Sequence, residues 1–430
     1  MRDMKESGVA WLGTIPKEYK TVPIGSLFTI KKDIIGQEPD TVLSITQTGV
    51  KPKDLSSNEG QNANSYAHYQ KVCVGDFAMN HMDLLTGWVD ISKYEGVTSP
   101  DYRVFSMNDE SQSAEFFLRV FQYYYANKIF FGFGQGVATL GRWRLPAVNF
   151  QKIDVPVPPP SEQKRIVKAI NAKVEKIEEL KQNVKDQIDK LKLYKQSLIT
   201  EIITKGLNSS APTIDSGISW IGSIPEHWKL CRIKNLADQS IPDSFIDGDW
   251  IESPYITDEG IRYLTTGNVG DGSFKRQGEG YITQDTFVDL NCKYAYPGDL
   301  VISRLNSPYG RACILPNDEE KYVLAVDIVI LRTKFNKRYI CYYTQCPGYQ
   351  RTVEDLARGT AMKRISRTNL GSIPILLPPI EEQDAIADYL DKRCEAIDAL
   401  ISIKQTKIEK LDQYKKSIIY EYVTGKKEVQ

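Results

Sequence analysis

Two long segments of the chain carry apolar residues at alternating spacings of four and three. The first runs from Ser161 to about Thr204, contains no proline or glycine, and places lysine, glutamate, aspartate and glutamine between its apolar positions. Its stripe consists of Ile170, Val174, Ile177, Val184, Ile188, Leu191, Leu198 and Ile202. A repeat of seven residues is typical of a coiled-coil seam, so the segment is predicted to be one long helix.

The second such segment lies 220 residues further on. Its stripe consists of Leu390, Cys394, Ile397, Ile401, Ile408, Leu411, Ile418 and Tyr422. Lys195 and Lys415 interrupt the two stripes at equivalent positions, and a charge on a seam can set register and orientation. Neither helix, about 44 residues or roughly 65 Å long, can bury its stripe alone. We expect the two to pair as an antiparallel coiled coil; the alternative is that each docks on its own domain.

Other parts of the chain repeat as well. Residues 6–16 return as 215–225, Pro159–Gln163 returns as Pro379–Gln383, and Tyr194–Ile199 returns as Tyr414–Ile419. The middles of the two halves share little beyond Gly75–Asp76 and Gly298–Asp299. Each half therefore has matching ends and a diverged centre, which is typical of a pseudo-symmetric protein that carries two different modules.

The diverged centres, residues 20–157 and 229–377, are rich in strand and turn signals. Strands are predicted at 41–46, 72–74, 102–105, 301–303 and 325–330, and helices at 115–127 and 338–344. The fold class is therefore α+β: two mixed α/β domains separated by two long helices that form an antiparallel coiled coil. The segments are 1–157 (first domain), 158–207 (first spacer helix), 208–376 (second domain) and 377–430 (second spacer helix).

Composition adds mainly exclusions. Lysine plus arginine and aspartate plus glutamate number 55 each, so DNA affinity has to come from local basic patches or from partners. No apolar run is long enough to span a membrane and the start lacks a signal peptide, so we expect a cytoplasmic protein. The seven cysteines form no CxxC pair and the three histidines are far apart, so we expect no metal site.

Enzymatic chemistry finds little support. Phe130–Gly134 matches the F-x-G-x-G motif of methyltransferases, but no (Asn/Asp)-Pro-Pro-(Tyr/Phe) segment accompanies it, so a glycine-rich turn is the better interpretation. The Pro–Asp and Glu-x-Lys fragments that a nuclease would need lie too far apart, and no P-loop is present. An autonomous methyltransferase or nuclease is therefore disfavoured. A coiled-coil scaffold with two protein-binding heads stays as the other alternative.

The repeated motifs carry a resemblance to a known family. Trp11–Pro16 and Trp220–Pro225, the Pro-Pro and Glu–Gln helix starts, and the Tyr–Lys–x–Ser endings followed by Glu201 and Glu421 occur twice in the same order. The whole chain resembles the specificity subunits of type I restriction–modification systems. The resemblance implies a non-catalytic subunit whose two target-recognition domains each bind part of a bipartite site on double-stranded DNA. It also implies helices that dock two modification (adenine methyltransferase) subunits, with restriction subunits joining. S-adenosylmethionine and ATP then belong to those partners, and this chain needs no cofactor.

Both domains end in a basic stretch of net charge +3, Gln135–Lys152 and Arg351–Arg367, which supplies attraction for phosphates. Arginine suits guanine and glutamine suits adenine in the major groove. The candidate DNA-contacting residues are Gln135, Arg142 and Arg144, then Arg358, Thr360, Lys363 and Arg364, with Asn80, His81, Arg304 and Asn306 as secondary candidates. Trp11 and Trp220 are expected to be packing anchors. The residues expected to form the helix interface are Ile170, Val174, Ile177, Ile188, Leu191, Leu390, Ile397, Ile401, Ile408 and Leu411.

A rigid spacer turns helix length into half-site spacing, so a heptad inserted into both helices is expected to lengthen the tolerated gap. The target sequence itself cannot be predicted, because loops that differ by a few residues read different bases.

Overall fold

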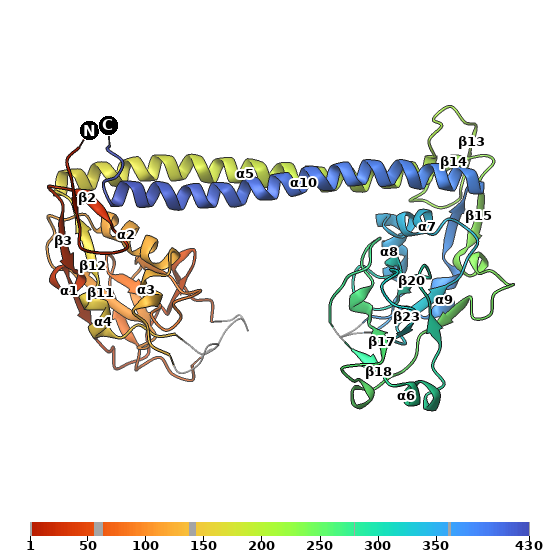
Figure 1. The fold of residues 1–430 in the computed structure, drawn as a ribbon, viewed down its shortest axis with the longest axis horizontal. Helices are drawn as coiled ribbons and strands as arrows, with labels where there is room; N and C mark the ends of the chain where they lie inside the picture. The colour runs from red at the N-terminus through yellow and green to blue at the C-terminus, as the bar shows by residue number, and fades with distance from the viewer. Residues whose placement is uncertain (1, 56–62, 137–142, 279, 360–362, 430) are drawn as a thin grey trace. The chain divides into compact units, whose positions relative to one another are not determined.

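The computed structural model describes residues 2–55, 63–136, 143–278, 280–359 and 363–429 (Figure 1). The chain forms two compact units, one made of Met1–Val184 with Thr406–Gln430 and the other of Lys185–Gln405. Each unit therefore combines one α/β module with parts of both long helices. Because neither unit corresponds to one of the four segments predicted above, the bounds of those segments stay a prediction.

The first unit is built on a four-stranded antiparallel sheet in the order β4-β11-β8-β9. Its strands are β4 (Phe28–Lys31), β11 (Arg103–Met107), β8 (Phe77–Met79) and β9 (Val89–Ile91). Around it lie β1 (Met4–Glu6), β2 (Thr14–Pro16), β3 (Lys20–Pro23), α1 (Ile24–Leu27), β5 (Leu43–Thr46), β6 (Gly49–Pro52), β7 (Gln70–Val72), β10 (Gly96–Thr98), α2 (Ala114–Ala126), α3 (Ile129–Gly132), α4 (Ala147–Lys152) and β12 (Asp154–Val157). Phe28, Phe77, Phe105, Phe117 and Phe121 form the aromatic centre of the core. Alternate strand residues are buried on opposite faces of the sheet, Phe77 and Phe105 in one apolar cluster and Ala78 and Val104 in another, so the strands read as short apolar runs.

The second unit repeats this plan with the sheet order β16-β23-β20-β21. Its strands are β16 (Phe245–Asp247), β23 (Ile328–Leu331), β20 (Leu300–Ser303) and β21 (Ala312–Ile314). Its other elements are β13 (Thr213–Asp215), β14 (Ser223–Pro225), β15 (Lys229–Arg232), β17 (Ile261–Leu264), β18 (Tyr281–Ile282), α6 (Gln284–Asp289), β19 (Tyr294–Ala295), β22 (Tyr322–Leu324), α7 (Lys337–Thr344), α8 (Pro347–Leu356), α9 (Arg367–Ser372) and β24 (Pro374–Leu377). The strands β18-β17-β22-β19 form an additional sheet in this unit.

The matching parts of the two units have the same partners. The hairpin β1–β2 corresponds to β13–β14, the pair β3–β12 to β15–β24, and α2 to α7. Trp11 packs on Tyr124 and Phe133, and Trp220 packs on Tyr343. Both tryptophans are therefore packing anchors within their own modules, as the repeated openings of the two halves predict.

The two long helices are unbroken. The first, α5, spans Pro160–Lys205, and the second, α10, spans Ile380–Val423. In the first unit Lys181 pairs with Asp412 at 2.6 Å and Lys415 pairs with Glu178 at 2.8 Å. The residue numbers rise along one helix as they fall along the other, so the helices are antiparallel. This confirms the predicted fold class.

The same register continues in the second unit. Lys195 binds Asp398 at 2.7 Å, and Lys404 donates to Gln187 at 2.6 Å. Lys195–Asp398 and Lys415–Glu178 are equivalent pairs, 220 positions apart, so each seam lysine meets an acid on the opposite helix. Of the predicted interface residues, Ile170, Ile177, Ile188, Leu390 and Ile397 are buried, and Val174, Leu191, Ile401, Ile408 and Leu411 are partly buried.

The repeated Glu–Gln motif at the helix starts has a structural explanation. Gln163, fully buried, donates to the carbonyl of Pro158 and accepts from the amide of Ser113, the residue that caps α2. Gln383, also fully buried, makes the same two bonds to Pro378 and to Asn336, the cap of α7. Each long helix is thereby tied to the first turn of the helix that covers its module.

The glutamates of this motif are held by residues near the start of each module. Glu162 accepts hydrogen bonds from Arg2 at 2.5 Å and from the Tyr19 hydroxyl at 2.9 Å. Glu382 accepts from Trp228 Nε1 at 3.1 Å and lies 2.9 Å from His227 Nε2. In both units an aromatic donor and a second nitrogen-bearing side chain thus tie the start of the long helix to its module.

Candidate nucleic-acid interface

In the basic stretch of each module, two residues form an isolated antiparallel bridge; the described residues at this bridge are called the hairpin. In the first unit the backbones of Gln135 and Arg144 exchange hydrogen bonds of 2.7 and 2.9 Å. In the second unit Arg358 and Arg364 do the same at 3.0 and 2.8 Å. The candidates Arg142 and Thr360 lie outside the described residues. The sequence-predicted basic stretches therefore share a backbone geometry.

Both hairpins are fixed to the ends of the strands that follow the Gly–Asp turns. The amide of Leu145 donates to the carbonyl of His81 at 2.9 Å, and the amide of Ile365 donates to that of Arg304 at 3.1 Å. Leu145 and Ile365 each follow the last arginine of the hairpin. The two groups of candidates predicted from different parts of the sequence are thus brought together in each module.

The cationic side chains of the hairpins face solvent. The side chains of Arg144, Lys363 and Arg364 are 53, 46 and 41% exposed. Gln135, Arg358 and Asn306 are exposed as well. Exposed cationic and amide side chains are the groups that form hydrogen bonds with DNA phosphates and base edges.

An aspartate stands beside the last arginine of each hairpin. Arg144 lies 3.9 Å from Asp101, and Arg364 Nε lies 2.5 Å from Asp327. Asp101 lies two residues before β11, and Asp327 directly precedes the equivalent strand β23. The pairing orients the guanidinium and leaves part of it open, which is the arrangement expected of a side chain that reads a partner with directional bonds.

Two of the secondary candidates are buried instead. His81 and Arg304 are only 7 and 4% exposed. Arg304 spends its donors on the carbonyls of Ile365 and Val326, at 3.2 and 2.5 Å, and its Nε lies 3.1 Å from Asp247. Both residues were predicted to contact DNA. Because their side chains are buried, they lie beneath the hairpin instead. Asn80 is half-buried, and its side chain accepts from the amide of Met82.

Arg103 is a residue of this site that was not predicted from the sequence. This residue begins β11, is 4% exposed, and donates from Nη2 to the carbonyl of Leu145 at 2.8 Å. Its guanidinium also lies over the ring of Phe150, 4.7 Å from the centroid. The available signal was a lone arginine in an otherwise apolar strand, where a charge is costly unless it serves a purpose.

Burial and two neighbouring cations control the ionisation of His81. Desolvation, then the charges of Arg103 and Arg144, lower its pKa to about 3, far below its ordinary value. His81 is therefore neutral at physiological pH and adds no charge beneath the first hairpin.

Acidification is expected to destabilise the first unit through His81. In the unfolded chain the imidazole takes up a proton below about pH 6.5, whereas the folded state excludes it down to about pH 3. The folded state therefore loses about 1.4 kcal/mol for each pH unit between these values, or about 2 kcal/mol at pH 5. Thermal unfolding of the intact chain and of His81→Gln between pH 7 and 5 measures this difference. An equal fall in Tm for both proteins contradicts the assignment.

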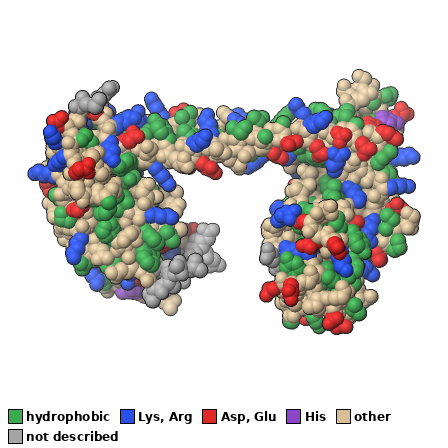
Figure 2. Space-filling model, in the orientation of Figure 1, with side chains coloured by type: hydrophobic (Ala, Val, Ile, Leu, Met, Phe, Trp, Pro, Cys, Tyr) green, Lys and Arg blue, Asp and Glu red, His purple; other side chains and the backbone are tan. Residues whose placement is uncertain are grey.

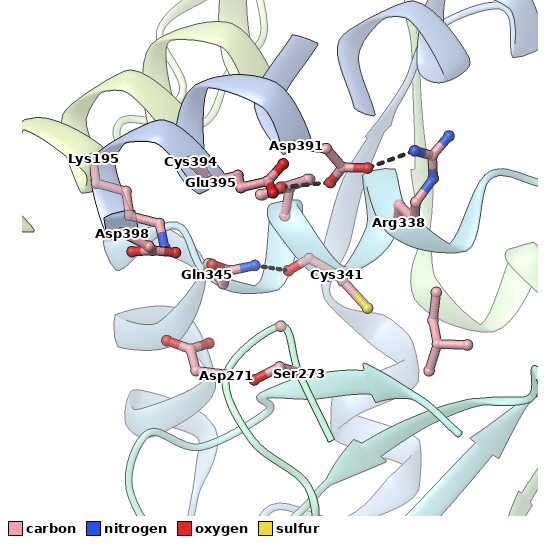
Figure 3. A pocket seen from close by; sticks show the side chains of 13 residues that line it. Lys195, Asp271, Ser273, Arg338, Cys341, Gln345, Asp391, Cys394, Glu395 and Asp398 are labelled. Carbon is pink, nitrogen blue, oxygen red and sulfur yellow. Dashed lines mark hydrogen bonds and ion pairs between the residues drawn. The ribbon is translucent and has the colours of Figure 1, made fainter. Parts of the chain in front are cut away.

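Two further features of the molecule are a cavity in the second unit and the Phe130–Gly134 segment. The cavity, of 510 Å³, is lined by the four acids Asp271, Asp391, Glu395 and Asp398 and by two cations, Lys195 and Arg338 (Figure 3). Both cations are already paired with carboxylates. An anionic ligand would be repelled there. Phe130–Gly134 belongs to α3 and the turn after it, with Phe130 buried in the aromatic core, so it is not an open glycine-rich loop.

Positive and negative side chains are interspersed over both units, as Figure 2 shows, which fits the net charge of zero. Among the described residues, no group of three His, Cys, Asp or Glu side chains is arranged to hold a metal ion. Within the same residues, no helix combines the length and the apolar character needed to cross a membrane.

The chain is similar to known proteins over nearly its whole length. The family model for the type I restriction modification DNA specificity domain matches residues 16–190 and, a second time, residues 225–413. A Methanocaldococcus jannaschii protein named for the MjaX specificity subunit of a type I restriction enzyme is 24% identical over 441 residues, covering 96% of this chain and 95% of that protein. The type I restriction enzyme MjaVIII specificity subunit of the same organism is 27% identical over 284 residues, which cover 64% of this chain and 63% of that protein.

A solved structure supports the fold independently. A chain from work on the complex assembly and conformational transition of the type I R-M system has a TM-score of 0.68 and 16% identity, and the match covers 95% of this chain and 98% of that one. The arrangement of two α/β modules and two long helices is therefore shared with that chain.

Proposed function

The chain belongs to the family of type I restriction–modification DNA specificity domains, and from this premise we propose that it is a specificity subunit that reads a bipartite DNA site. The observation that carries the proposal is the duplicated hairpin. Exposed arginines stand at the same place in two otherwise diverged modules, on the same strand end and beside the same kind of aspartate. A DNA site with two unlike halves requires two modules that contact different bases but hold their contacting residues in the same way.

Each module reads its half-site with the hairpin in the major groove. Arg144, Arg358 and Arg364 are suited to the O6 and N7 acceptors of guanine, and Gln135 to adenine. Lys363 and the local excess of positive charge attract the backbone phosphates. Because the chain as a whole is neutral, binding depends on these local patches and on its partners.

The long helices supply spacing and docking. Their exposed sides are offered to two modification subunits, which restriction subunits then join. This chain itself is not an enzyme in this proposal: the partners bind S-adenosylmethionine and ATP and carry out methylation, translocation and cleavage. Because chromosomal DNA is the target, the assembly acts in the cytoplasm.

The function is tested by mapping N6-methyladenine across the host genome, with the gene present and with the gene deleted. We expect methylation to disappear at a single gapped, bipartite motif on deletion, which also reveals the target sequence. Restoring the gene restores the mark.

Two control outcomes separate the alternatives. If deletion changes no methylation, co-purification of the tagged chain distinguishes a silent system, in which a modification subunit is still captured, from a misassigned one. Capture of other proteins through the modules, with no methyltransferase and no DNA, supports the coiled-coil scaffold instead.

A further inference from the structure

We infer that Arg103 and Arg304 are positioning residues that hold the recognition hairpins in the pose that reads DNA. The inference rests on the proposed function, because it concerns how each hairpin discriminates its half-site. Neither residue touches solvent to any extent, so neither is offered as a DNA contact.

The second unit shows the arrangement most completely. Arg304 binds Ile365 twice: its own carbonyl accepts from the Ile365 amide at 3.1 Å, and its guanidinium donates to the Ile365 carbonyl at 3.2 Å. Its other end is fixed by the carbonyl of Val326 and by Asp247. Ile365 directly follows Arg364, the last DNA-contacting candidate of the hairpin. Arg304 therefore fixes both the amide and the carbonyl of the residue next to that candidate.

The first unit reaches the same carbonyl from another strand. Arg103 of β11 donates to the carbonyl of Leu145, the residue that follows Arg144, while His81 at the position equivalent to Arg304 supplies only its backbone carbonyl. The donor thus comes from neighbouring strands in the two units, yet the accepting atom is equivalent. Two modules that share so little sequence keep this one contact, although the residue that makes it has moved.

A purely structural role would not need a cation. A neutral side chain satisfies a buried carbonyl at lower cost, whereas burying a guanidinium carries a large desolvation penalty. Burial lowers the pKa of Arg103 to about 10, with Arg144 adding to the effect. A rigid planar fork is the group that fixes a backbone in both direction and distance, and such support is what keeps a binding constellation in its productive geometry.

The two clamps differ in their surrounding charge. Arg304 lies between two acids, Asp247 at 3.1 Å and Asp327 at 3.8 Å. Among the described residues Arg103 has no ion pair, and its Nη1 atom has no hydrogen-bond partner. Arg103 therefore adds an uncompensated charge beneath its hairpin, and Arg304 does not.

The test uses the intact chain assembled with its modification subunits and a duplex that carries the site from the methylation map. Duplexes with one changed base in either half-site measure discrimination, and Arg364→Ala identifies the half-site of the second unit. We expect Arg304→Met to lower discrimination at that half-site on the order of tenfold and to leave the other half-site unchanged. Arg103→Met is expected to have the mirrored effect, a loss of discrimination at the half-site of the first unit with the other half-site unchanged.

Arg332→Met is the matched control. Arg332 is also a largely buried arginine of the second unit; it binds Asp299 at 3.1 Å and the carbonyl of Tyr294 at 2.7 Å, at the opposite end of β23. We expect it to lower Tm at least as much as Arg304→Met while discrimination is kept. Equal loss of discrimination in both variants, or loss at both half-sites, overturns the inference. An unsubstituted complex that fails to discriminate at all refutes the proposed function and not the positioning role.

Discussion

Replacing Arg364 by alanine is expected to weaken site-specific binding of the assembled complex about tenfold to a hundredfold, with the loss confined to one half-site. Arg364 is exposed and pairs with Asp327. It is one of the two bridged residues of the hairpin, which is bonded to the strand end. A two-pronged contact to guanine contributes about 1–3 kcal/mol of discrimination, which is this range of affinity. Binding to the mapped site and to single-base variants of each half-site measures the effect.

Arg364→Lys separates the two ways in which this arginine can act. Lysine keeps the charge but loses the planar fork, so a base-reading Arg364 predicts lost discrimination with an unchanged salt dependence. A phosphate contact predicts that discrimination is kept as well, because lysine retains the charge that a phosphate binds. Arg276→Ala serves as the control, because Arg276 is an exposed arginine of the same unit that is also paired with an aspartate, Asp318. Unchanged binding of the Arg364→Ala complex removes this residue from the interface.

Lengthening both long helices by three heptads is expected to lengthen the preferred gap between half-sites by about nine base pairs. Twenty-one added residues extend a helix by roughly 31 Å, at about 3.4 Å per base pair. This is close to one turn of DNA, so both half-sites stay on the same side of the duplex. A single added heptad lengthens the gap by about three base pairs but turns one half-site by roughly a third of a turn, and we expect weaker methylation at that spacing.

The insertions belong between Val184 and Lys185 in α5 and between Gln405 and Thr406 in α10, where the two compact units meet in sequence. The ion pairs within each unit are then untouched, since Lys181–Asp412 and Lys195–Asp398 lie on either side. Methylation of a library of sites with varied gaps gives the preferred spacing. The control inserts two residues into each helix, which turns the apolar stripe by about 200° and so away from its partner. An unchanged preferred gap in the three-heptad protein refutes a spacing role for the helices.

The long-period features of the sequence were the most predictable. The heptad stripes indicated that each helix needs a partner, and the duplicate copy offered one of equal length. The antiparallel orientation was an inference beyond the periodicity, and the cross-helix ion pairs confirm it. The strands at Arg103–Met107, Leu300–Ser303 and Ile328–Leu331 were found because they are short apolar runs next to turn signals. The short helix at Ile129–Gly132 was instead interpreted as a glycine-rich turn, because the glycines gave no sign that Phe130 packs in the core.

The site was less predictable because its contacts join distant parts of the chain. Nothing in the local sequence says that Gln163 caps the segment before α2, fifty residues earlier, or that Arg103 reaches Leu145. Polar residues after a strand can face either way, and for His81 and Arg304 the direction is inward. The exposed hairpin candidates were predicted from their positive charge, which can be recognised in a sequence. Their role in contacting bases stays a prediction.

The duplicated helix starts also bear on how such a chain changes over generations. Each module joins the rest of the protein through the same few bonds, those of Gln163 and Glu162 in one copy and of Gln383 and Glu382 in the other. A recombination event whose ends fall within the DNA encoding these boundaries replaces one module and leaves the helices and their docking surfaces intact. Under the proposed function, such an exchange changes half of the target sequence in a single step.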